Sequence, residues 1–185
     1  MRFKTVLIGL LCLYYTQEIY AQRHYTGISS IEASYGMNMF GRNNTHLNLG
    51  YSKYRNRTSY WKLGFNYFEK SFSYNLPSEE DNVGQRVGST GRDYYIDANY
   101  YKTVATNLTS LYLSLGIGAY TGVEYYKMPE KEYDFILGPK IGAEIEYFIL
   151  PKTALIGRIN QYWSPFSDIS HWNTIWNVGV KILIY

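Results

Sequence analysis

The sequence predicts an all-β protein: an eight-stranded antiparallel up-and-down β-barrel of the outer-membrane type, with a lumen filled by side chains. Three observations predict this fold. Apolar and polar residues alternate with a period of two in eight segments, and the connectors between these segments are alternately short and long. Tyrosine and glycine are abundant, with 22 and 16 of the 185 residues. Aromatic residues at this density favour strands and half-buried surfaces over a helical bundle.

The first 21 residues have the layout of a secretory signal peptide. Arg2 and Lys4 precede the apolar run 6–13, and Ala21 is a small residue suited to cleavage. Cys12, the only cysteine, lies in this run, and Leu11 before it is not the small residue that lipidation requires. We therefore expect residues 1–21 to be a signal peptide and residues 22–185 to form one barrel domain. That domain has no disulfide, thiolate nucleophile or cysteine metal site.

The clearest predicted strand is 111–125. Every second residue there is apolar or tolerated by lipid, whereas glycine and polar residues are frequent at the positions between. This segment exceeds the usual soluble strand of about five or six residues and suits a bilayer crossing, which needs about 9–11 residues. Segment 137–147 alternates in the same way. Weaker copies are found at 31–39, 47–52, 61–67, 94–100, 155–163 and 176–184.

The connectors provide an independent check on this topology. The short ones are 55–57, 103–108 and 150–153, and the longer ones are 40–45, 71–91, 128–134 and 164–172. Outer-membrane barrels have short periplasmic turns and longer outer loops. Because the chain starts in the periplasm, the longer set is expected on the outer side. Within the longest connector, 77–91 is acidic and rich in glycine, and we expect a mobile surface loop.

The second phase of the alternation is expected to face the lumen. Its charged members are Glu32, Lys62, Asp97, Glu124, Lys140, Glu144, Glu146, Arg158 and Lys181. Buried charges must be paired, and the interior of an eight-stranded barrel is only wide enough for side chains to fill. We therefore expect a structural network, in which Arg158 and Lys140 pair with Glu144, Glu146, Asp97 or Glu124, and no channel.

Few other residues suggest chemistry. His24 is expected to be inert, whereas His46 and His171 fall near the predicted outer rim, where Asp168 and Ser170 also lie. Some eight-stranded barrels are lipid-modifying enzymes with Ser, His and Asp at this rim, so such an enzyme is one alternative. The glycines of 116–122 are wrongly spaced for a dinucleotide loop. No catalytic residue, metal site or cofactor is predicted. With 18 basic and 15 acidic side chains the net charge is only +3, and this near balance argues against direct nucleic-acid binding, which needs a strongly basic surface.

The end of the chain is similar to the C-terminal signal that the barrel assembly machinery reads. That signal combines a polar residue, a glycine and two alternating hydrophobic residues, which would be Asn177, Gly179, Ile182 and Ile184. Tyr185 extends one residue beyond the pattern. We therefore expect the barrel assembly machinery to be one partner of the chain.

Several ordered segments resemble the TraO family of conjugative transposon proteins from Bacteroidetes. They are Gly91-Arg-Asp-Tyr-Tyr-Ile-Asp-Ala-Asn-Tyr-Tyr, the run from Leu113 to Tyr125, Gly138-Pro-Lys-Ile-Gly-Ala-Glu-Ile-Glu-Tyr-Phe-Ile, and Leu155-Ile-Gly-Arg-Ile-Asn-Gln-Tyr-Trp. The resemblance extends from about residue 28 to the C-terminus. It implies a role in conjugative DNA transfer as an outer-membrane component of the mating apparatus, and it transfers no catalytic residue.

The expected function is thus a non-enzymatic integral outer-membrane barrel of a conjugation apparatus. Its expected partners are outer-membrane lipid, the barrel assembly machinery and other conjugation proteins, without nucleic acid. The rim-sited lipid-modifying enzyme and a surface adhesin with tyrosine-rich loops remain the alternatives.

Overall fold

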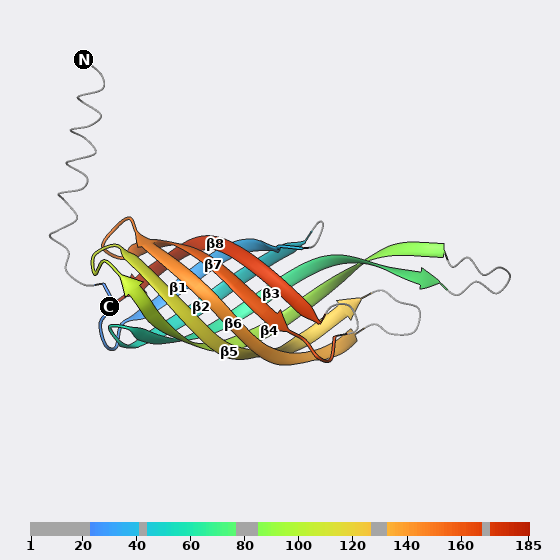
Figure 1. The fold of residues 1–185 in the computed structure, drawn as a ribbon, viewed down its shortest axis with the longest axis horizontal. Helices are drawn as coiled ribbons and strands as arrows, with labels where there is room; N and C mark the ends of the chain where they lie inside the picture. Colours follow the sequence, from blue (N-terminus) through green and yellow to red (C-terminus); the bar gives the residue numbers. More distant parts are fainter. Residues whose placement is uncertain (1–22, 41–43, 77–84, 127–132, 168–170) are drawn as a thin grey trace, which may run out of the picture.

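The computed structural model describes residues 23–40, 44–76, 85–126, 133–167 and 171–185. Eight antiparallel strands form a closed barrel in which each strand pairs with its sequence neighbours and β1 pairs with β8 (Figure 1). The strands are β1 (Ser29–Asn38), β2 (Thr45–Asn56), β3 (Ser59–Leu76), β4 (Gln85–Thr106), β5 (Leu111–Tyr126), β6 (Tyr133–Phe148), β7 (Thr153–Trp163) and β8 (Trp172–Ile184). The predicted fold class is confirmed. The predicted signal peptide lies outside the described residues.

The two ends of the barrel differ in how the strands are joined. The turns β2–β3 (57–58), β4–β5 (107–110) and β6–β7 (149–152) lie at the end that also carries residue 23 and the C-terminus, here called the terminal end (Figure 1). Side-chain amides close two of these turns. Asn56 Oδ1 accepts a hydrogen bond from Thr58 N at 2.9 Å, and Asn107 Oδ1 accepts one from Ser110 N at 2.9 Å. The longer connectors lie at the opposite end, here called the loop end.

The connector predicted at 71–91 is in part wrong. β3 continues to Leu76 and β4 begins at Gln85, and the two strands stay paired from Ser71↔Thr90 to Leu76↔Gln85. β2 pairs with β3 only as far as Glu69, and β5 pairs with β4 only as far as Gly91. The extra pairs therefore form a two-stranded ribbon that projects beyond the barrel at the loop end (Figure 1).

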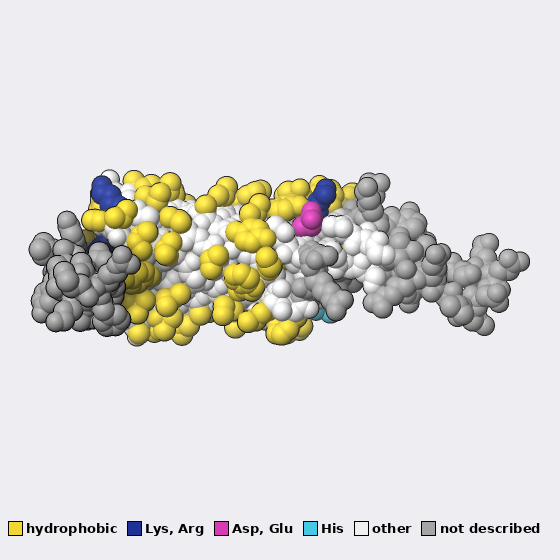
Figure 2. Space-filling model, turned by 90° about the horizontal axis from the view of Figure 1, so that it is seen from above, with side chains coloured by type: hydrophobic (Ala, Val, Ile, Leu, Met, Phe, Trp, Pro, Cys, Tyr) yellow, Lys and Arg dark blue, Asp and Glu magenta, His cyan; other side chains and the backbone are white. Residues whose placement is uncertain are grey.

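The outward phase of the strands is mainly apolar. Leu49, Leu63 and Ile117, for example, are 61%, 60% and 67% exposed. Figure 2 shows hydrophobic side chains spread along the length of the barrel. An apolar surface of this extent is typical of a membrane-embedded protein. In the described part of the chain, no helix is long and apolar enough to cross a membrane.

Aromatic residues form two belts on this outward surface. Near the terminal end the belt contains Tyr51, Trp61, Tyr100 and Tyr147, with the Trp61 and Tyr100 ring centroids 5.0 Å apart. Near the loop end the belt contains Tyr67, Tyr94, Tyr125, Tyr133, Trp163 and Trp172. Tyrosine and tryptophan prefer the two interfaces of a bilayer, so the belts mark the expected limits of the hydrocarbon.

The lumen is filled in three layers. The layer near the terminal end is mainly aromatic and contains Ile28, Tyr54, Tyr60, Tyr101, Tyr112, Phe148, Ala154 and Leu183. A second mainly aromatic layer near the loop end contains Phe68, Tyr95, Tyr120, Ile136, Tyr162 and Ile175. Charged and amide side chains occupy the space between them. This middle layer holds most of the candidate site.

Candidate functional site: the charged lumen

All nine charged residues predicted to face the lumen are buried, and none is more than 5% exposed. They come from seven of the eight strands, β1 and β3 to β8. The register of the sheet brings some of them together directly, since Glu144 of β6 stands opposite Arg158 of β7. Other pairs form across the lumen, between strands that are not neighbours.

Arg158 lies at the centre of the network. Its Nε lies 2.6 Å from Glu144 Oε2, and its Nη2 contacts the same oxygen and also lies 2.7 Å from Glu32 Oε1. Its Nη1 donates a hydrogen bond of 3.3 Å to Asn48 Oδ1. The planar guanidinium therefore joins β7 to β6, β1 and β2. A lysine could not reproduce this arrangement, because its ammonium is a single donor centre on a flexible stem.

Two lysines complete the neutralisation of the central glutamates. Lys62 forms an ion pair with Glu32, and Lys181 Nζ lies 2.6 Å from Glu146 Oε1 and also contacts Glu144. Tyr60 OH donates a hydrogen bond of 2.8 Å to Glu144 Oε1. Burying a carboxylate is costly unless it is paired and hydrogen-bonded, and each of these glutamates has such a partner.

Lys140 and Asp97 form the pair on the loop-end side of the middle layer. Lys140 Nζ lies 2.7 Å from Asp97 Oδ2, to which Asn66 Nδ2 also donates at 3.2 Å. Asn99 Nδ2 donates to Asp97 Oδ1 at 2.9 Å. The carboxylate is therefore bonded through both oxygens. One ammonium and two amide groups thus stabilise its negative charge.

Glycines make room for these side chains. A Cβ at Gly50 would lie 2.7 Å from Glu32 Cγ, and a Cβ at Gly116 would lie 2.5 Å from Tyr101 Cε1. A filled lumen of eight strands cannot accept both the long charged side chains and a side chain at every lumen-facing position. This crowding explains why the inward phase is rich in glycine.

The segment before β1 packs into the terminal end of the lumen, and His24, which was expected to be inert, takes part in this packing. His24 is 1% exposed, and its Nε2 lies 3.0 Å from Glu146 Oε2. Its ring stacks on Tyr112 with centroids 4.0 Å apart. The neighbouring Arg23 backbone N donates to Tyr112 OH at 3.2 Å, and the Arg23 guanidinium lies 5.2 Å from the centre of the Phe148 ring. The sequence pattern could not show this, because these residues precede the alternation.

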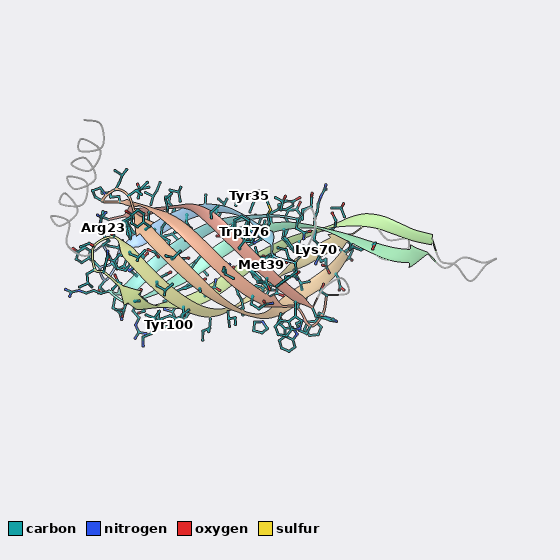
Figure 3. All side chains as sticks on the ribbon, turned by 45° about the horizontal axis from the view of Figure 1, so that its top comes forward. Arg23, Tyr35, Met39, Lys70, Tyr100 and Trp176 are labelled. Carbon is teal, nitrogen blue, oxygen red and sulfur yellow. The ribbon has the colours of Figure 1, made fainter. Side chains whose placement is uncertain are left out.

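A second charged cluster lies at the loop end and contains two residues that the sequence interpretation missed, Lys70 and Asp93. Figure 3 shows Lys70 at this end and Arg23 at the other. Lys70 Nζ lies 3.2 Å from Asp93 Oδ2 and forms an ion pair with Glu124. Ser167 Oγ donates to Glu124 Oε2 at 3.0 Å. Lys70 continues the inward phase of Lys62, and Asp93 shares the phase of Asp97, so parity could have identified both.

The two candidate rim histidines lie in different environments. His46 is 1% exposed and not at the rim, and its two ring nitrogens lie 2.7 Å from Asn177 Oδ1 and 2.9 Å from Tyr95 OH. His171 is exposed, with its Nδ1 3.1 Å from the Ser164 carbonyl oxygen. Both ring nitrogens of His46 therefore have hydrogen-bonding partners, one an amide and the other a tyrosine hydroxyl. His46 lies inside the lumen because it belongs to the inward phase of β2.

The remaining predicted site residues have mixed positions. Asp168 and Ser170 lie outside the described residues. Gly179 stands opposite Ser34, and Ile182 and Ile184 are 44% and 46% exposed on the outward face of β8. Their role with Asn177 as an assembly signal stays a prediction. Within the described ranges, no group of three or more His, Cys, Asp or Glu side chains could hold a metal ion.

One exposed ion pair lies just beyond the loop-end belt. Arg92 Nε is 3.1 Å from Glu69 Oε2, and Tyr67 OH donates to the same oxygen at 2.7 Å. The hydrogen bonds from Tyr67 and Arg92 lower the pKa of the Glu69 carboxyl. This pair is solvated, unlike the pairs within the lumen.

Comparison with known proteins supplies a family. The family described as "Conjugative transposon protein TraO" matches residues 26–184. No curated protein matches the sequence. The resemblance noted in the sequence is thereby confirmed over nearly the whole described chain.

Solved structures share the fold at low sequence identity. The outer-membrane protein OprG of Pseudomonas aeruginosa matches with a TM-score of 0.64 and 7% identity, over 89% of this chain and 99% of its own. The N-terminal barrel domain of OprF from the same organism gives 0.57 and 13%, over 86% and 98%. Ail, the attachment invasion locus protein of Yersinia pestis, gives 0.54 and 16%, over 86% and 99%. These likenesses concern the fold alone.

Proposed function

The chain belongs to the TraO family of conjugative transposon proteins, and from this premise we propose that it is a non-enzymatic outer-membrane component of a conjugative transfer apparatus. The family match over residues 26–184 is the observation that carries the proposal. The apolar outward face and its two aromatic belts support a membrane location. Export by a signal peptide and insertion by the barrel assembly machinery are part of the same proposal.

The lumen supports a structural role over catalysis or transport. Arg158, Lys62 and Lys181 are each in contact with buried carboxylates, and aromatic layers lie on both sides of them. A catalytic acid or base must be able to reach a substrate, and these groups are buried behind other side chains. We therefore assign the network to stabilising the barrel, which then presents its ends to other apparatus proteins.

The surface adhesin is the second candidate, and the projecting β3–β4 ribbon is the observation that favours it. Ail, whose name describes an attachment and invasion protein, has the same barrel fold. The rim-sited enzyme has less support, because His46 is buried and bonded to Asn177 and Tyr95. The two candidates can be separated by deletion of the gene: loss of an apparatus component should lower the transfer frequency, whereas loss of an adhesin should weaken attachment to recipient cells.

The membrane location can be tested on the purified protein and in fractionated cells. A folded barrel should migrate differently on a detergent gel before and after boiling, and should fractionate with outer membranes. Recovery of the protein as a soluble periplasmic species would contradict the location.

The transfer role is tested by deleting the gene in a donor strain. We expect the transfer frequency to fall by orders of magnitude and to recover with the intact gene or with a His171→Ala variant. Recovery with this variant separates the apparatus role from the rim-sited enzyme. Unchanged transfer with altered lipid A, or unchanged transfer with weaker attachment to recipient cells, would overturn the apparatus role.

A further inference from the structure

Over the ranges that the structure describes, the outer surface of the terminal end carries charged side chains of one sign. Exposed basic side chains are Lys53 and Arg55 on β2, Arg57 in the next turn, Lys102 on β4 and Lys152 in the β6–β7 turn. Among the described residues, the acidic side chains that are not buried are Glu69 and Asp134, and both belong to the loop end. Figure 2 shows dark blue side chains at the terminal end, and magenta beside dark blue toward the opposite end.

Three of these cations continue the lipid-facing phase of their strands. Lys53 and Arg55 follow Tyr51 at steps of two on β2, and Lys102 follows Tyr100 on β4. Lys53 also stands directly opposite Trp61 of β3. Tyr51, Trp61 and Tyr100 form the terminal-end belt, so the cations lie one step beyond it. Tyr100 in Figure 3 marks the level of this belt on the outside of the barrel.

This position matches the headgroup region of a bilayer. Aromatic belts sit at headgroup level, and long basic side chains next to them place their aliphatic stems along apolar surface and their charges among the headgroups. None of the described carboxylates forms an ion pair with Lys53, Arg55 or Lys102. The exposed Arg92 at the loop end, in contrast, pairs with Glu69 at 3.1 Å.

We propose that Lys53, Arg55 and Lys102 form a basic collar that binds the headgroups of anionic glycerophospholipids in the periplasmic leaflet. Lys53, Arg55 and Lys102 are exposed on the outward phase of strands in the barrel wall, so the anions expected at this depth are the phosphates of such lipids. The collar fixes the depth of the barrel in the membrane. This inference rests on the proposed membrane location and is independent of the transfer role.

The test measures lipid selectivity in nanodiscs that contain the full mature chain. Spin-labelled phosphatidylglycerol and phosphatidylcholine are compared as probes of the lipid shell, at low and at high salt. We expect a preference for phosphatidylglycerol of about fivefold, the effect of roughly one basic side chain near an anionic surface. The preference should fall at high salt, because exposed charges are screened.

Variants assign the preference to the collar. The triple variant Lys53→Gln, Arg55→Gln, Lys102→Gln should bind both lipids equally, whereas Lys152→Gln should behave as the native protein. Lys152 is the matched control because it lies in a turn, with its Nζ 4.9 Å from the centre of the Tyr185 ring. Heat-modifiable migration confirms that each variant is folded.

Three outcomes would overturn the proposal. The first is a triple variant that retains the preference for phosphatidylglycerol. The second is a native protein without any preference for phosphatidylglycerol. If its triple variant also loses transfer, the collar would be assigned to an acidic protein partner. The third, measured with lipid A as an additional probe in the same nanodiscs, is a stronger preference for lipid A than for phosphatidylglycerol, which would place the collar in the other leaflet. A triple variant with lost selectivity and normal transfer supports the collar whatever the fate of the transfer proposal.

Discussion

The lumen and the lipid-facing surface are built from alternate residues of the same strands, yet they constrain the sequence differently. On β7, Arg158 is 3% exposed and contacts two carboxylates, whereas the next residue, Ile159, is 49% exposed. Lipid accepts almost any apolar side chain at Ile159, because acyl chains adapt to its shape. The lumen requires one particular cation at Arg158, since its partners are fixed by the wall. A lipid-facing position therefore requires only that its residue be apolar, whereas a lumen position requires one particular residue.

The largest expected effect that tests this contrast is the loss of Arg158. Replacing Arg158 with Ala leaves Glu32 and Glu144 short of positive charge, and stranding a buried charge costs about 3–5 kcal/mol. The measurement is the free energy of unfolding in urea, with the barrel in detergent. Ile159→Val is the matched control and should change little. Equal stability of the two variants would show that the lumen is as tolerant as the surface.

A charge placed on the lipid face should cost nearly as much. Ile117 lies midway along β5 and is 67% exposed, so Ile117→Arg moves a cation into the hydrocarbon. An arginine near the bilayer midplane of a barrel costs about 2–4 kcal/mol. The measurement is equilibrium unfolding in lipid vesicles, with Ile117→Val for comparison. An arginine variant as stable as the valine variant would mean that Ile117 does not contact lipid.

A smaller difference in stability is expected between glycine-to-alanine substitutions on the two faces of the barrel wall. Gly116→Ala places a Cβ 2.5 Å from Tyr101 Cε1, and overpacking of this kind costs about 1–3 kcal/mol. Gly157→Ala, on the outward phase, meets only the Ile145 Cγ2 methyl at 3.0 Å and should cost less. Adding Tyr101→Leu should recover part of the Gly116→Ala loss, as a double-mutant cycle would measure. A larger loss for Gly157→Ala would reverse the comparison.

The smallest effect is expected for an ion pair outside the lumen. The Arg92 and Glu69 side chains are 59% and 34% exposed, so water already solvates both charges. Arg92→Gln should therefore leave the urea midpoint unchanged within error. A loss of stability comparable with that of Arg158→Ala would show that solvent exposure does not determine how much an ion pair contributes to the stability of this barrel.

The period-two pattern predicted most of this architecture from the sequence. Strand number, phase and the alternation of short and long connectors all followed from it, because a membrane barrel forces one face of each strand to be apolar. The β3–β4 ribbon was missed although Phe72, Tyr74 and Leu76 alternate with polar residues. In β4, residues 85–90 show no such alternation, and the acidic residues before them favoured a loop.

Partner choice within the lumen could not be predicted in the same way. Parity places Arg158 and Glu32 inside, but only the stagger of the closed sheet brings Arg158 Nη2 of β7 to 2.7 Å from Glu32 Oε1 of β1. His24 is harder still, since it precedes the first strand and its place depends on the cavity that the other strands leave. Sequence periodicity therefore determines which face a residue occupies, and barrel closure determines its neighbours.

The seam between β1 and β8 closes the barrel and completes the ion pairs of the lumen. Ten paired positions, from Ser29↔Ile184 to Asn38↔Ile175, join the first strand synthesised to the last. Glu32 on β1 meets Arg158 of β7 and Lys181 of β8 only when those strands arrive. A barrel that stopped short of β8 would lack Lys181, which contacts Glu32, Glu144 and Glu146, and these carboxylates would lie beside a membrane that cannot solvate them. We therefore expect release into the bilayer before β8 has paired with β1 to be disfavoured, because it would expose incompletely paired carboxylates to lipid.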